Sequence, residues 1–377
     1  MIREIHIENF KSVDQLTLDL GRVNVLIGAN GCGKTNILEA ICFGGAAAAG
    51  KLDNEYLAPR GIRYSVPRSM RSGFSKDQLT QPINLKFVNG ERVTFEAELT
   101  EEGTDFPSWK ATVGEQIKHT PDGSPISSRF NLTALFSRPE NFNLDERTLR
   151  QVLKVASAFR SLQSFLIYAP DPITVRRLED EERTLPLGIN GAGLFRLLQT
   201  FSAEKLAELK SHLHVIDWFD DLELPESRLP GERTLRIRDQ FIADGLQYFE
   251  QRSANEGFLF LLFYLSLFIS EHTPPFFAID NLDNGLNPKL CAYLSKTLAE
   301  LAAKHEKQVI LTTHNPAVLD GIDLKDDEQR LFVVYRNVDG RTRVRRVVPK
   351  DLPHEGEPVR LSEAFLRGYI GGLPKNF

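Results

Sequence analysis

Apolar and polar residues alternate along the start of the chain, first over residues 2–7 and again over 16–20. This period of two predicts two strands that are each buried on one face. The denser apolar run at 23–27 is typical of a strand that is buried on both faces. It leads into a glycine-rich turn that begins at Gly28 and then into a stretch with helical spacing at 36–43. The chain is therefore expected to begin with three strands, a turn and a helix.

The middle of the chain has a different pattern. Residues 44–80 are rich in Gly, Ala, Arg and Ser, which predicts a loop or lid of low regularity. Alternation over 83–100 around an Asn-Gly pair predicts a hairpin, and 108–118 predicts another strand of the same small antiparallel sheet. Helical spacing over 140–166 and 191–222 predicts a helical lobe.

The last third of the chain alternates between helices and short apolar strands. Residues 258–270 are apolar on all sides and predict a fully buried helix. The strand 276–280, the helix 289–305 and the strand 308–313 form a βαβ pattern, which implies a parallel sheet. Residues 331–348 predict a closing hairpin around an Asp-Gly pair.

These elements predict an α/β fold class with a mixed sheet core, an antiparallel β subdomain and a helical lobe. We expect residues 1–135 to form the N-terminal part of the core together with the antiparallel sheet. Residues 136–245 would then form the helical lobe, and residues 246–377 the C-terminal part of the core.

Composition narrows the class of protein. The 377 residues include 46 Lys and Arg against 51 Asp and Glu, and this net charge of −5 excludes a globally basic coat for nucleic acid. Three cysteines without a Cys-x-x-Cys pair argue against a disulfide framework and against a structural zinc or iron–sulfur site. The start at Met1 lacks an apolar leader, and the longest apolar run is too short to span a membrane. We therefore expect a cytoplasmic protein without a membrane partner.

A phosphate-binding motif follows the third predicted strand. Residues 28–35 match the pattern G-x-x-x-x-G-K-[ST], and they stand between a buried strand and a helix, as this motif requires. The glycines let backbone N–H groups surround phosphate oxygens, and the following helix directs its positive N-terminal end at the same anion. The residues expected to bind nucleotide here are Gly28, Ala29, Asn30, Gly31, Cys32, Gly33, Lys34 and Thr35. Lys34 would meet the β- and γ-phosphates, and the Thr35 hydroxyl would ligate Mg²⁺.

Two further polar residues follow buried strands far downstream. Asp280 ends the apolar strand at 276–279, where a carboxylate can reach Mg²⁺ directly or through water. His314 follows the strand at 308–313, at the carboxyl end of the predicted sheet, where α/β folds bind ligands. There it could donate a hydrogen bond to the γ-phosphate, the alternative being a loop histidine that only satisfies local contacts.

Four segments together resemble a known family. They are "IENFKS…VNVLIGANGCGKTNILEAI", "FFAIDNLDNGLNP", "LTTHNP" and the tail "LSEAFLRGYIGGLPKNF". They resemble the ABC-type ATPases of the RecF, SMC and OLD group, which are common in DNA repair and in bacterial anti-phage systems. The resemblance covers about residues 1–45 and 245–377. It implies a P-loop NTPase fold of the ABC and SMC-head type, with ATP and Mg²⁺ as ligands. It also implies a homodimer in which two protomers sandwich two ATP molecules, or a higher oligomer held by other surfaces.

The resemblance extends the nucleotide site beyond the phosphate loop. It assigns Lys11 and Asn36 to the same site. Relatives carry a Ser-x-Gly signature at the start of a helix, which meets the partner protomer's ATP. Here Gly257 matches the glycine of that signature, and either Ser253 or Asn255 can take the polar position.

One position departs from the family pattern. Relatives usually have Glu directly after the metal-binding Asp, where it polarises the attacking water, whereas this chain has Asn281. An amide cannot accept a proton, and loss of a general base costs about 10²–10⁴ in rate. The resemblance therefore predicts ATP binding with slow hydrolysis, unless Glu256 or Asp283 substitutes. Asp283 also matches the interface loop of the family. The candidate catalytic positions are thus His314, Asn281 and Asp283.

Two basic stretches raise the question of a nucleic-acid partner. Arg341, Arg343 and Arg345 alternate along a predicted strand, and Arg60 to Arg71 lies in the predicted lid. The strand could touch DNA phosphates, and the lid stretch, with Arg60, Arg63, Arg68 and Arg71, could contact nucleotide or DNA. A solvated edge strand and a solvated loop are the favoured explanations. The acidic cluster at 179–182 is flanked by arginines, which favours a self-paired surface over a nuclease centre.

These observations leave three hypotheses. The leading one is a nucleotide-dependent dimerising switch that controls a partner effector, a nuclease or a toxin, in anti-phage defence. OLD-type nucleases carry a nuclease domain after the ATPase, whereas this chain ends soon after His314, so we expect any nuclease to be a separate polypeptide. The alternatives are a DNA-binding repair ATPase of the RecF and SMC type and a non-hydrolysing scaffold that ATP stabilises.

Overall fold

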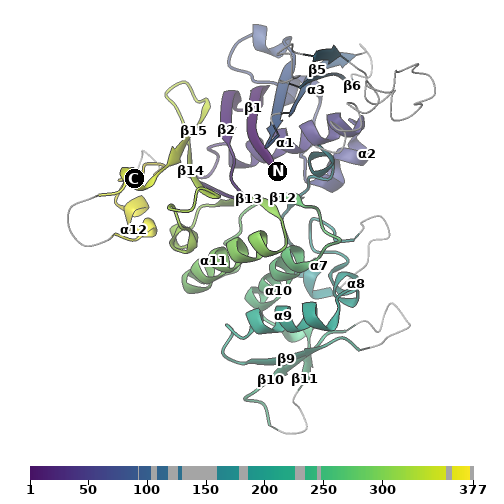
Figure 1. The fold of residues 1–377 in the computed structure, drawn as a ribbon, viewed down its shortest axis with the longest axis vertical. Helices are drawn as coiled ribbons and strands as arrows, with labels where there is room; N and C mark the ends of the chain where they lie inside the picture. Colours follow the sequence, from purple (N-terminus) through teal and green to yellow (C-terminus); the bar gives the residue numbers. More distant parts are fainter. Residues whose placement is uncertain are drawn as a thin grey trace.

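Two six-stranded sheets, a three-stranded sheet and a set of helices make up the described part of the fold in a computed structural model of the chain (Figure 1). The structure describes residues 1–91, 93–102, 108–117, 126–129, 159–177, 186–225, 234–243, 248–353 and 359–373. The predicted α/β class with a mixed core and an antiparallel sheet is confirmed.

The antiparallel sheet has the strand order β2-β1-β4-β5-β6-β7. Its strands are β1 (Ile2–Phe10), β2 (Val13–Asp19), β4 (Ile83–Asn89), β5 (Val93–Glu102), β6 (Ser108–Ile117) and β7 (Ile126–Arg129). The predicted hairpin around the Asn-Gly pair is the β4–β5 pair, with Phe87 opposite Phe95. Buried apolar residues alternate with polar ones in the middle of β1, at Ile5 and Ile7, and in β4, at Ile83, Leu85 and Phe87, so one face of this sheet is available for a core.

The mixed sheet has the order β15-β14-β3-β13-β12-β8. Its strands are β3 (Val23–Ile27), β8 (Ile167–Tyr168), β12 (Phe276–Ile279), β13 (Gln308–Thr313), β14 (Gln329–Arg336) and β15 (Thr342–Val347). All neighbours are parallel except the edge strand β15, so the expected βαβ arrangement and closing hairpin are confirmed. Because β13 lies between β3 and β12, the carboxyl ends of these three strands meet at one edge of the sheet.

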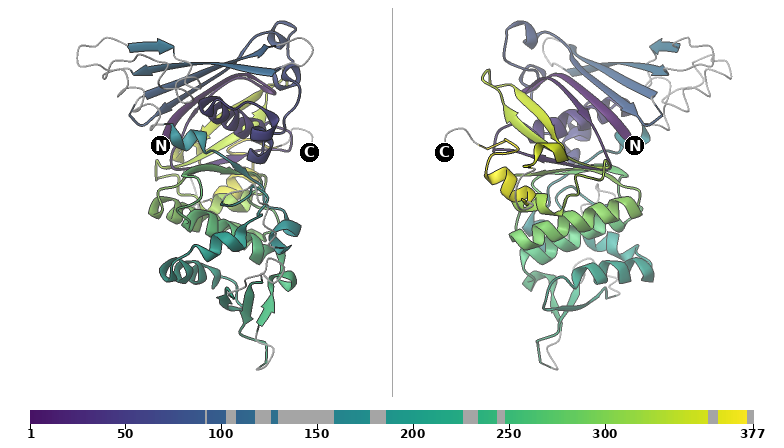
Figure 2. Two further views of the ribbon diagram at one scale, coloured as in Figure 1. Left: turned by 90° about the vertical axis from the view of Figure 1, so that its right-hand side faces the viewer. Right: turned by 60° about the vertical axis from the view of Figure 1, so that its left-hand side comes forward.

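Alternation within the mixed sheet divides the interior into two cores. In β3, Val25 belongs to one core and its neighbour Leu26 to the other. The core containing Leu26 holds α1 (Lys34–Ala49) between the two sheets. The core containing Val25 packs α10 (Glu256–Ile269) and α11 (Pro288–Lys304) on the opposite face. Figure 2 shows this sequence of layers from two further directions.

The first helix is longer than its sequence pattern predicts. We expected a helix at 36–43 and a loop over 44–80, but α1 continues to Ala49. Gly44 and Gly45 lie inside this helix at positions without room for a side chain: a Cβ on Gly44 would lie 2.4 Å from the Phe87 ring, and one on Gly45 would lie 2.2 Å from the Leu162 carbonyl oxygen. The rest of the expected loop contains short helices, α2 (Asn54–Leu57), η1 (Ala58–Arg60), α3 (Pro67–Met70) and η2 (Asp77–Leu79).

The helical lobe is partly helical and partly a small sheet. Its described elements are α6 (Arg160–Gln163), α7 (Pro172–Arg177), α8 (Leu194–Gln199), α9 (Ala203–Leu213), β9 (Phe219–Glu223), β10 (Arg236–Asp239), β11 (Tyr248–Glu250) and η5 (Gln251–Ser253). The helix expected to run to 222 ends at Leu213, and β9 follows because Phe219 and Leu222 pack into the core from a strand. Most of the helix expected over 140–166, and the acidic cluster at 179–182, lie outside the described residues.

The short helix η6 (Pro316–Gly321) follows β13 and packs against α11 and α12 (Leu361–Leu366), and η7 (Pro349–Asp351) follows β15. Within the described residues, no helix combines the length and the apolar character needed to cross a membrane.

A buried lysine makes the stability of this fold depend on pH. Lys307 is 3% exposed, and its Nζ donates to the carbonyl and the hydroxyl oxygens of Thr273, both at 2.9 Å. Burial lowers the pKa of Lys307 from 10.5 to about 8. Between these values the unfolded chain binds more protons than the folded chain, so this group adds stability as the pH rises. We expect the free energy of unfolding of the wild type, relative to Lys307→Met, to increase from pH 8 to pH 10 by up to about 1.4 kcal/mol per pH unit.

Urea titrations at several pH values measure this difference. A constant difference between the two proteins across that range would contradict the depressed pKa.

Candidate functional site

The phosphate loop lies between β3 and α1, as its motif requires. Gly31 and Gly33 have φ values of 72° and 109°, in the left-handed region that favours glycine. A Cβ on Gly28 would lie 2.1 Å from the Val334 carbonyl oxygen, and one on Gly33 would lie 2.1 Å from the Thr342 hydroxyl. The three glycines therefore fit a backbone that turns tightly against β14 and β15.

The N-terminal end of α1 is open to an anion. Gly33 occupies the N-cap position of this 16-residue helix, and no side chain caps it. The backbone N–H groups of a first turn need an outside partner, and the helix dipole favours a negative one. Lys34 adds a buried ammonium group, whose Nζ donates to the carbonyl oxygens of Gly28 at 2.7 Å and Ala29 at 3.1 Å. The Lys34 side chain thus folds back over the phosphate loop, and its ammonium group lies next to the space that the loop surrounds.

Asp280 lies beside the phosphate loop, although the two are far apart in the sequence. The Thr35 hydroxyl, 245 positions away, donates to Asp280 Oδ2 at 2.8 Å, and the Thr312 hydroxyl donates to Oδ1. A hydroxyl and a carboxylate are the oxygen ligands that Mg²⁺ prefers, so the donor set fits that ion. The structure therefore brings Lys34, Thr35 and Asp280 together at one edge of the mixed sheet.

His314 follows β13 at the same edge and has an acidic neighbour. Its Nε2 lies 3.3 Å from Asp283 Oδ2, and the His314 side chain is 52% exposed whereas that of Asp283 is 6% exposed. The Thr313 hydroxyl donates to Asp283 Oδ1 at 2.6 Å. The turn after β12 thus places a buried carboxylate behind an accessible imidazole.

Asn281 occupies a backbone conformation that suits its residue type. Its φ of 56° lies in the left-handed region, where Asn is enriched among the residues with a Cβ. Its N–H donates to the Thr312 hydroxyl at 2.9 Å, and the residue is exposed. At the position next to Asp280 the structure therefore uses the left-handed φ and the backbone N–H of Asn281, and the residue is exposed to solvent.

The residues expected to form the signature lie at the start of α10, and one of them caps that helix. Asn255 is the N-cap of α10, and its side chain accepts from the Phe258 N–H at 2.8 Å. Ser253 lies two residues earlier, in η5, and is exposed. Gly257 lies in the first turn, close to the backbone of Gly285. The cap position therefore favours Asn255 over Ser253 as the polar member of the signature, on the face of the mixed sheet opposite α1.

Lys11 and Asn36 lie next to the phosphate loop with partners of their own. Lys11 Nζ is 2.6 Å from Glu39 Oε2, and the Asn36 amide donates to the Ser12 hydroxyl at 2.6 Å. Arg63 Nε reaches the other Glu39 oxygen at 2.7 Å, and this hydrogen bond raises the pKa of Arg63. Glu39 was not predicted as a site residue, and Arg63 was considered only as part of the basic stretch in the lid. The sequence feature that could have pointed to Glu39 is a charged residue within an otherwise apolar helix, one turn after Thr35.

The basic stretches are largely neutralised by acids of the same chain. Arg341 and Arg343 lie 2.7 Å and 3.8 Å from Asp14, and Arg345 lies 3.0 Å from Asp351. Arg341 precedes β15 and belongs to the turn, which corrects the expected single strand of alternating arginines. In the other stretch, Arg71 is 2.8 Å from Glu101. These pairings favour the solvated edge strand over a DNA surface.

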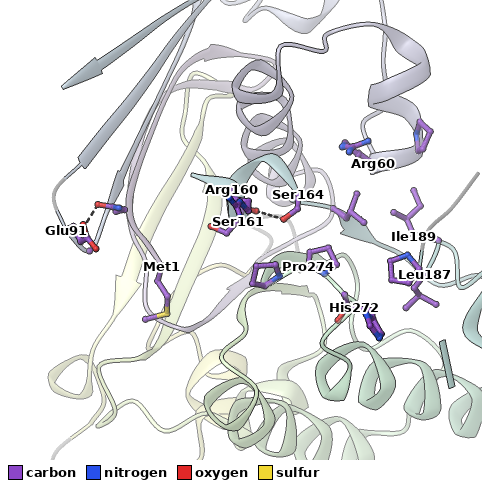
Figure 3. A pocket seen from close by; sticks show the side chains of 18 residues that line it. Met1, Arg60, Glu91, Arg160, Ser161, Ser164, Leu187, Ile189, His272 and Pro274 are labelled. Atoms are coloured by element: carbon purple, nitrogen blue, oxygen red, sulfur yellow. Dashed lines mark hydrogen bonds between the residues drawn. The ribbon is translucent and has the colours of Figure 1, made fainter. Parts of the chain in front are cut away.

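A separate cavity of about 860 Å³ lies away from the phosphate loop (Figure 3). Its lining includes Met1, which precedes β1, and Pro274 and Pro275, which precede β12. It therefore opens at the amino ends of these strands. The convergence of Lys34 and Asp280 lies at the carboxyl ends, so this cavity is not the nucleotide site.

The strand order, the phosphate loop and the carboxylate at the end of β12 define a P-loop ATPase of the ABC and SMC-head class. Residues 23–320 match the model of the family described as "AAA domain, putative AbiEii toxin, Type IV TA system". The chain belongs to this family.

Solved structures and curated proteins agree with that class. The chain is similar to an SMC head bound to the C-terminal winged-helix domain of ScpA, with a TM-score of 0.60, 17% identity and coverage of 93% of this chain and 98% of that one. It is also similar to the SMC head domain from Thermotoga maritima, with a TM-score of 0.51, 18% identity and coverage of 92% and 98%. At these identities the likeness concerns the fold alone.

Two curated proteins match in sequence. An OLD nuclease from Thermus scotoductus is 21% identical over 363 residues, which cover 89% of this chain and 64% of the nuclease. An uncharacterized protein from Methanocaldococcus jannaschii is 34% identical over 95 residues, which cover 24% of this chain and 42% of that protein. The chain therefore spans less than two thirds of the length of either relative. The predicted resemblance to the RecF, SMC and OLD group is confirmed.

Proposed function

We propose that this protein is an ATP-dependent switch, in which two copies close around two ATP molecules and thereby control a partner effector. The observation that carries the proposal is the hydrogen bond from Thr35 to Asp280, because it joins the phosphate loop to the metal carboxylate. Both ends of that bond offer oxygen atoms to one magnesium ion, next to the open N-terminus of α1.

Each part of the site has a distinct role toward ATP. The phosphate-loop amides and Lys34 would bind the β- and γ-phosphates, while Thr35 and Asp280 would hold Mg²⁺. When bound, Mg²⁺ neutralises charge on the phosphates. Asn255 and Gly257, at the start of α10, would meet the nucleotide of the partner protomer. A helix N-terminus that faces a γ-phosphate across an interface loses its target after hydrolysis, which gives a physical basis for switching.

We propose that the partner is an effector in anti-phage defence, of the nuclease or toxin kind. The family description refers to a putative toxin, and one relative is named as a nuclease. We therefore propose that nucleotide-driven closure governs a separate nuclease or toxin. Arg343 and Arg345 of β15 pair with acids of the same chain, which gives less support to direct clamping of DNA.

The oligomeric state with and without nucleotide tests the switch. We expect Mg-ATP to convert the protein into a species of twice the mass, because an isologous dimer completes both ATP sites. Size-exclusion chromatography with light scattering measures this change, and Lys34→Ala serves as the control that cannot bind ATP. An equal mass with and without Mg-ATP would contradict the switch. A larger assembly that is already present without nucleotide would mean that other surfaces of the chain hold it together.

Asn281 itself is expected to contribute little to hydrolysis. We predict that Asn281→Gly changes the steady-state ATPase rate by less than about threefold, because an amide cannot take the proton of the attacking water. Glycine keeps the positive φ of this position without strain, so the substitution removes the side chain alone. A phosphate-release assay measures the rate. A loss of about a hundredfold would show that the Asn281 side chain takes part in the reaction.

The scaffold alternative predicts a different result in the same assay. A wild-type rate equal to that of Lys34→Ala, together with ATP-dependent dimerisation, would favour a scaffold that ATP stabilises.

A further inference from the structure

We propose that the cavity at the amino ends of β1 and β12 binds a small organic anion, a molecule with a phosphate or carboxylate group on an apolar body. The cavity has a volume of about 860 Å³, within the range of about 300–1,000 Å³ that is typical of small-molecule sites. It is separate from the phosphate loop, so this inference goes beyond the proposed function and does not depend on it.

The walls of the cavity are rigid and in part apolar. Four of its lining residues are prolines, and the ring of a proline fixes φ, so these stretches of wall have little freedom to move. Leu166, Leu187 and Ile189 add aliphatic side chains, and Leu187 is buried. A wall that is already formed suits the apolar body of a ligand, because little further ordering is needed on binding.

Hydrogen bonds attach these walls to the mixed sheet. The Leu166 carbonyl oxygen accepts from the Ala278 N–H of β12 at 2.9 Å, and the Pro275 carbonyl oxygen accepts from the Gln308 N–H of β13 at 2.7 Å. The Ile189 carbonyl oxygen accepts at 2.9 Å from the N–H of the residue that follows β8. The cavity is therefore part of the folded framework, with its shape set by three neighbouring strands.

Basic side chains give the cavity its charge. Arg60, Arg160 and His272 line it, from η1, α6 and the segment before β12. Within the described part of the chain, neither arginine forms an ion pair with a carboxylate. Figure 3 shows that the three side chains come from different elements around the space, so a ligand between them would meet positive charge from more than one direction.

Arg60 is held in place by neutral groups. Its guanidinium carbon lies 3.5 Å from the centroid of the Tyr56 ring, and its Nη1 donates to the Tyr56 carbonyl oxygen at 3.2 Å. Stacking on an aromatic ring orients the planar guanidinium and leaves its charge uncompensated. A guanidinium oriented in this way can form paired hydrogen bonds with a phosphate or a carboxylate.

A buried cation lies behind another part of the wall. Lys307 Nζ donates to the carbonyl and hydroxyl oxygens of Thr273 at 2.9 Å and to the Pro274 carbonyl oxygen at 3.4 Å, and both of these residues line the cavity. Because Lys307 is 3% exposed, its charge is screened much less than that of a surface lysine. It therefore adds to the attraction for an anion, although the chain as a whole has a net charge of −5.

The acid among the described lining residues is Glu91, in the turn between β4 and β5. Its backbone N–H donates to the Asn89 side chain at 3.0 Å. In Figure 3, Glu91 and Met1 lie at one end of the space, whereas Arg60 and Ile189 lie at the other. We therefore expect the charged group of the ligand to lie away from Glu91, toward the arginines.

Three probes of similar shape test the chemical class: phenyl phosphate, benzoate and benzyl alcohol. NMR of the histidine rings of the wild-type protein at pH 7 locates binding, with His272 assigned from the spectrum of His272→Ala. We expect the better of the two anions to shift the His272 signal with a dissociation constant of about 1 mM or less, at least about tenfold tighter than benzyl alcohol. The tighter of the two anions identifies the charged group. His6, on the antiparallel sheet, is the internal control and should not shift.

Arginine variants test the source of the selectivity. Arg160→Ala and Arg60→Ala should each weaken binding of the better anion by at least about tenfold, because each removes a charge-assisted contact. Arg160 is exposed, so its replacement should leave the fold intact. Arg68→Ala is the matched control, since Arg68 is exposed in α3 and does not line the cavity. Its affinity should stay within about threefold of the wild type.

Three results would overturn the inference. They are the absence of a His272 shift with both anions up to about 10 mM, an equal affinity for benzyl alcohol, and an unchanged affinity in both arginine variants of the cavity. None of them bears on ATP binding at the phosphate loop, so failure here leaves the proposed function standing.

Discussion

Replacing Lys34 by alanine is expected to abolish ATP binding. Lys34 is buried, and its ammonium group lies over the phosphate loop on the carbonyl oxygens of Gly28 and Ala29. Removing one partner of a buried charged contact costs about 2–5 kcal/mol, so we expect the affinity for Mg-ATP to fall at least about thirtyfold. Isothermal titration calorimetry or a fluorescent ATP analogue measures the change.

Lys51→Ala is the matched control for this experiment, because Lys51 is exposed just beyond the C-terminal end of the same helix. It should leave the affinity within about threefold of the wild type. Circular dichroism should show that both variants are folded. Micromolar affinity retained by a folded Lys34→Ala protein would refute the role of the phosphate loop.

Replacing Glu39 by alanine is expected to cost about 3 kcal/mol of folding stability. Glu39 is fully buried in α1, and its carboxylate binds Lys11 at 2.6 Å and Arg63 at 2.7 Å. Removing one partner of a buried ion pair leaves an uncompensated charge and costs about 3–5 kcal/mol. The Arg63 side chain is 66% exposed and can turn to water, whereas that of Lys11 is 15% exposed, so the lower end of this range applies.

Urea unfolding followed by circular dichroism measures that loss. Glu96→Ala is the matched control, because its ion pair with Lys86 lies on a half-exposed face of the antiparallel sheet. Exposed pairs contribute about 0–1 kcal/mol. Equal losses of folding stability for Glu39→Ala and Glu96→Ala would show that the ion pairs of Glu39 contribute no more to stability than an exposed pair.

Many elements of this fold could be predicted from local pattern alone. The buried strand at 23–27, the helix at 256–269 and the βαβ unit after it follow from apolar periodicity, which reports burial directly. Prediction was wrong for the residues after 43, where Gly44 and Gly45 remain helical. The close approach of Phe87 and Leu162 requires glycine at these two positions of the helix, and no local pattern records such a contact.

The residues of the candidate site also divide into those that the sequence predicts and those that only the structure reveals. The phosphate loop can be found from its motif, and Asp280 from the apolar strand before it. The sequence left Ser253 and Asn255 as equal choices, and the N-cap of α10 now favours Asn255. It gave no sign that Lys11 would pair with Glu39, since the two belong to different elements.

The chain's own order of residues determined the nucleotide-binding motif and the candidate metal ligand Asp280 with Asn281 after it, because each is a property of a short segment. Only the tertiary structure decided which side chains act together. The insertion of β13 between β3 and β12 places Thr35 against Asp280 and Asp283 behind His314. Such contacts depend on the order of strands in a sheet, and strand order is set by packing across the whole core.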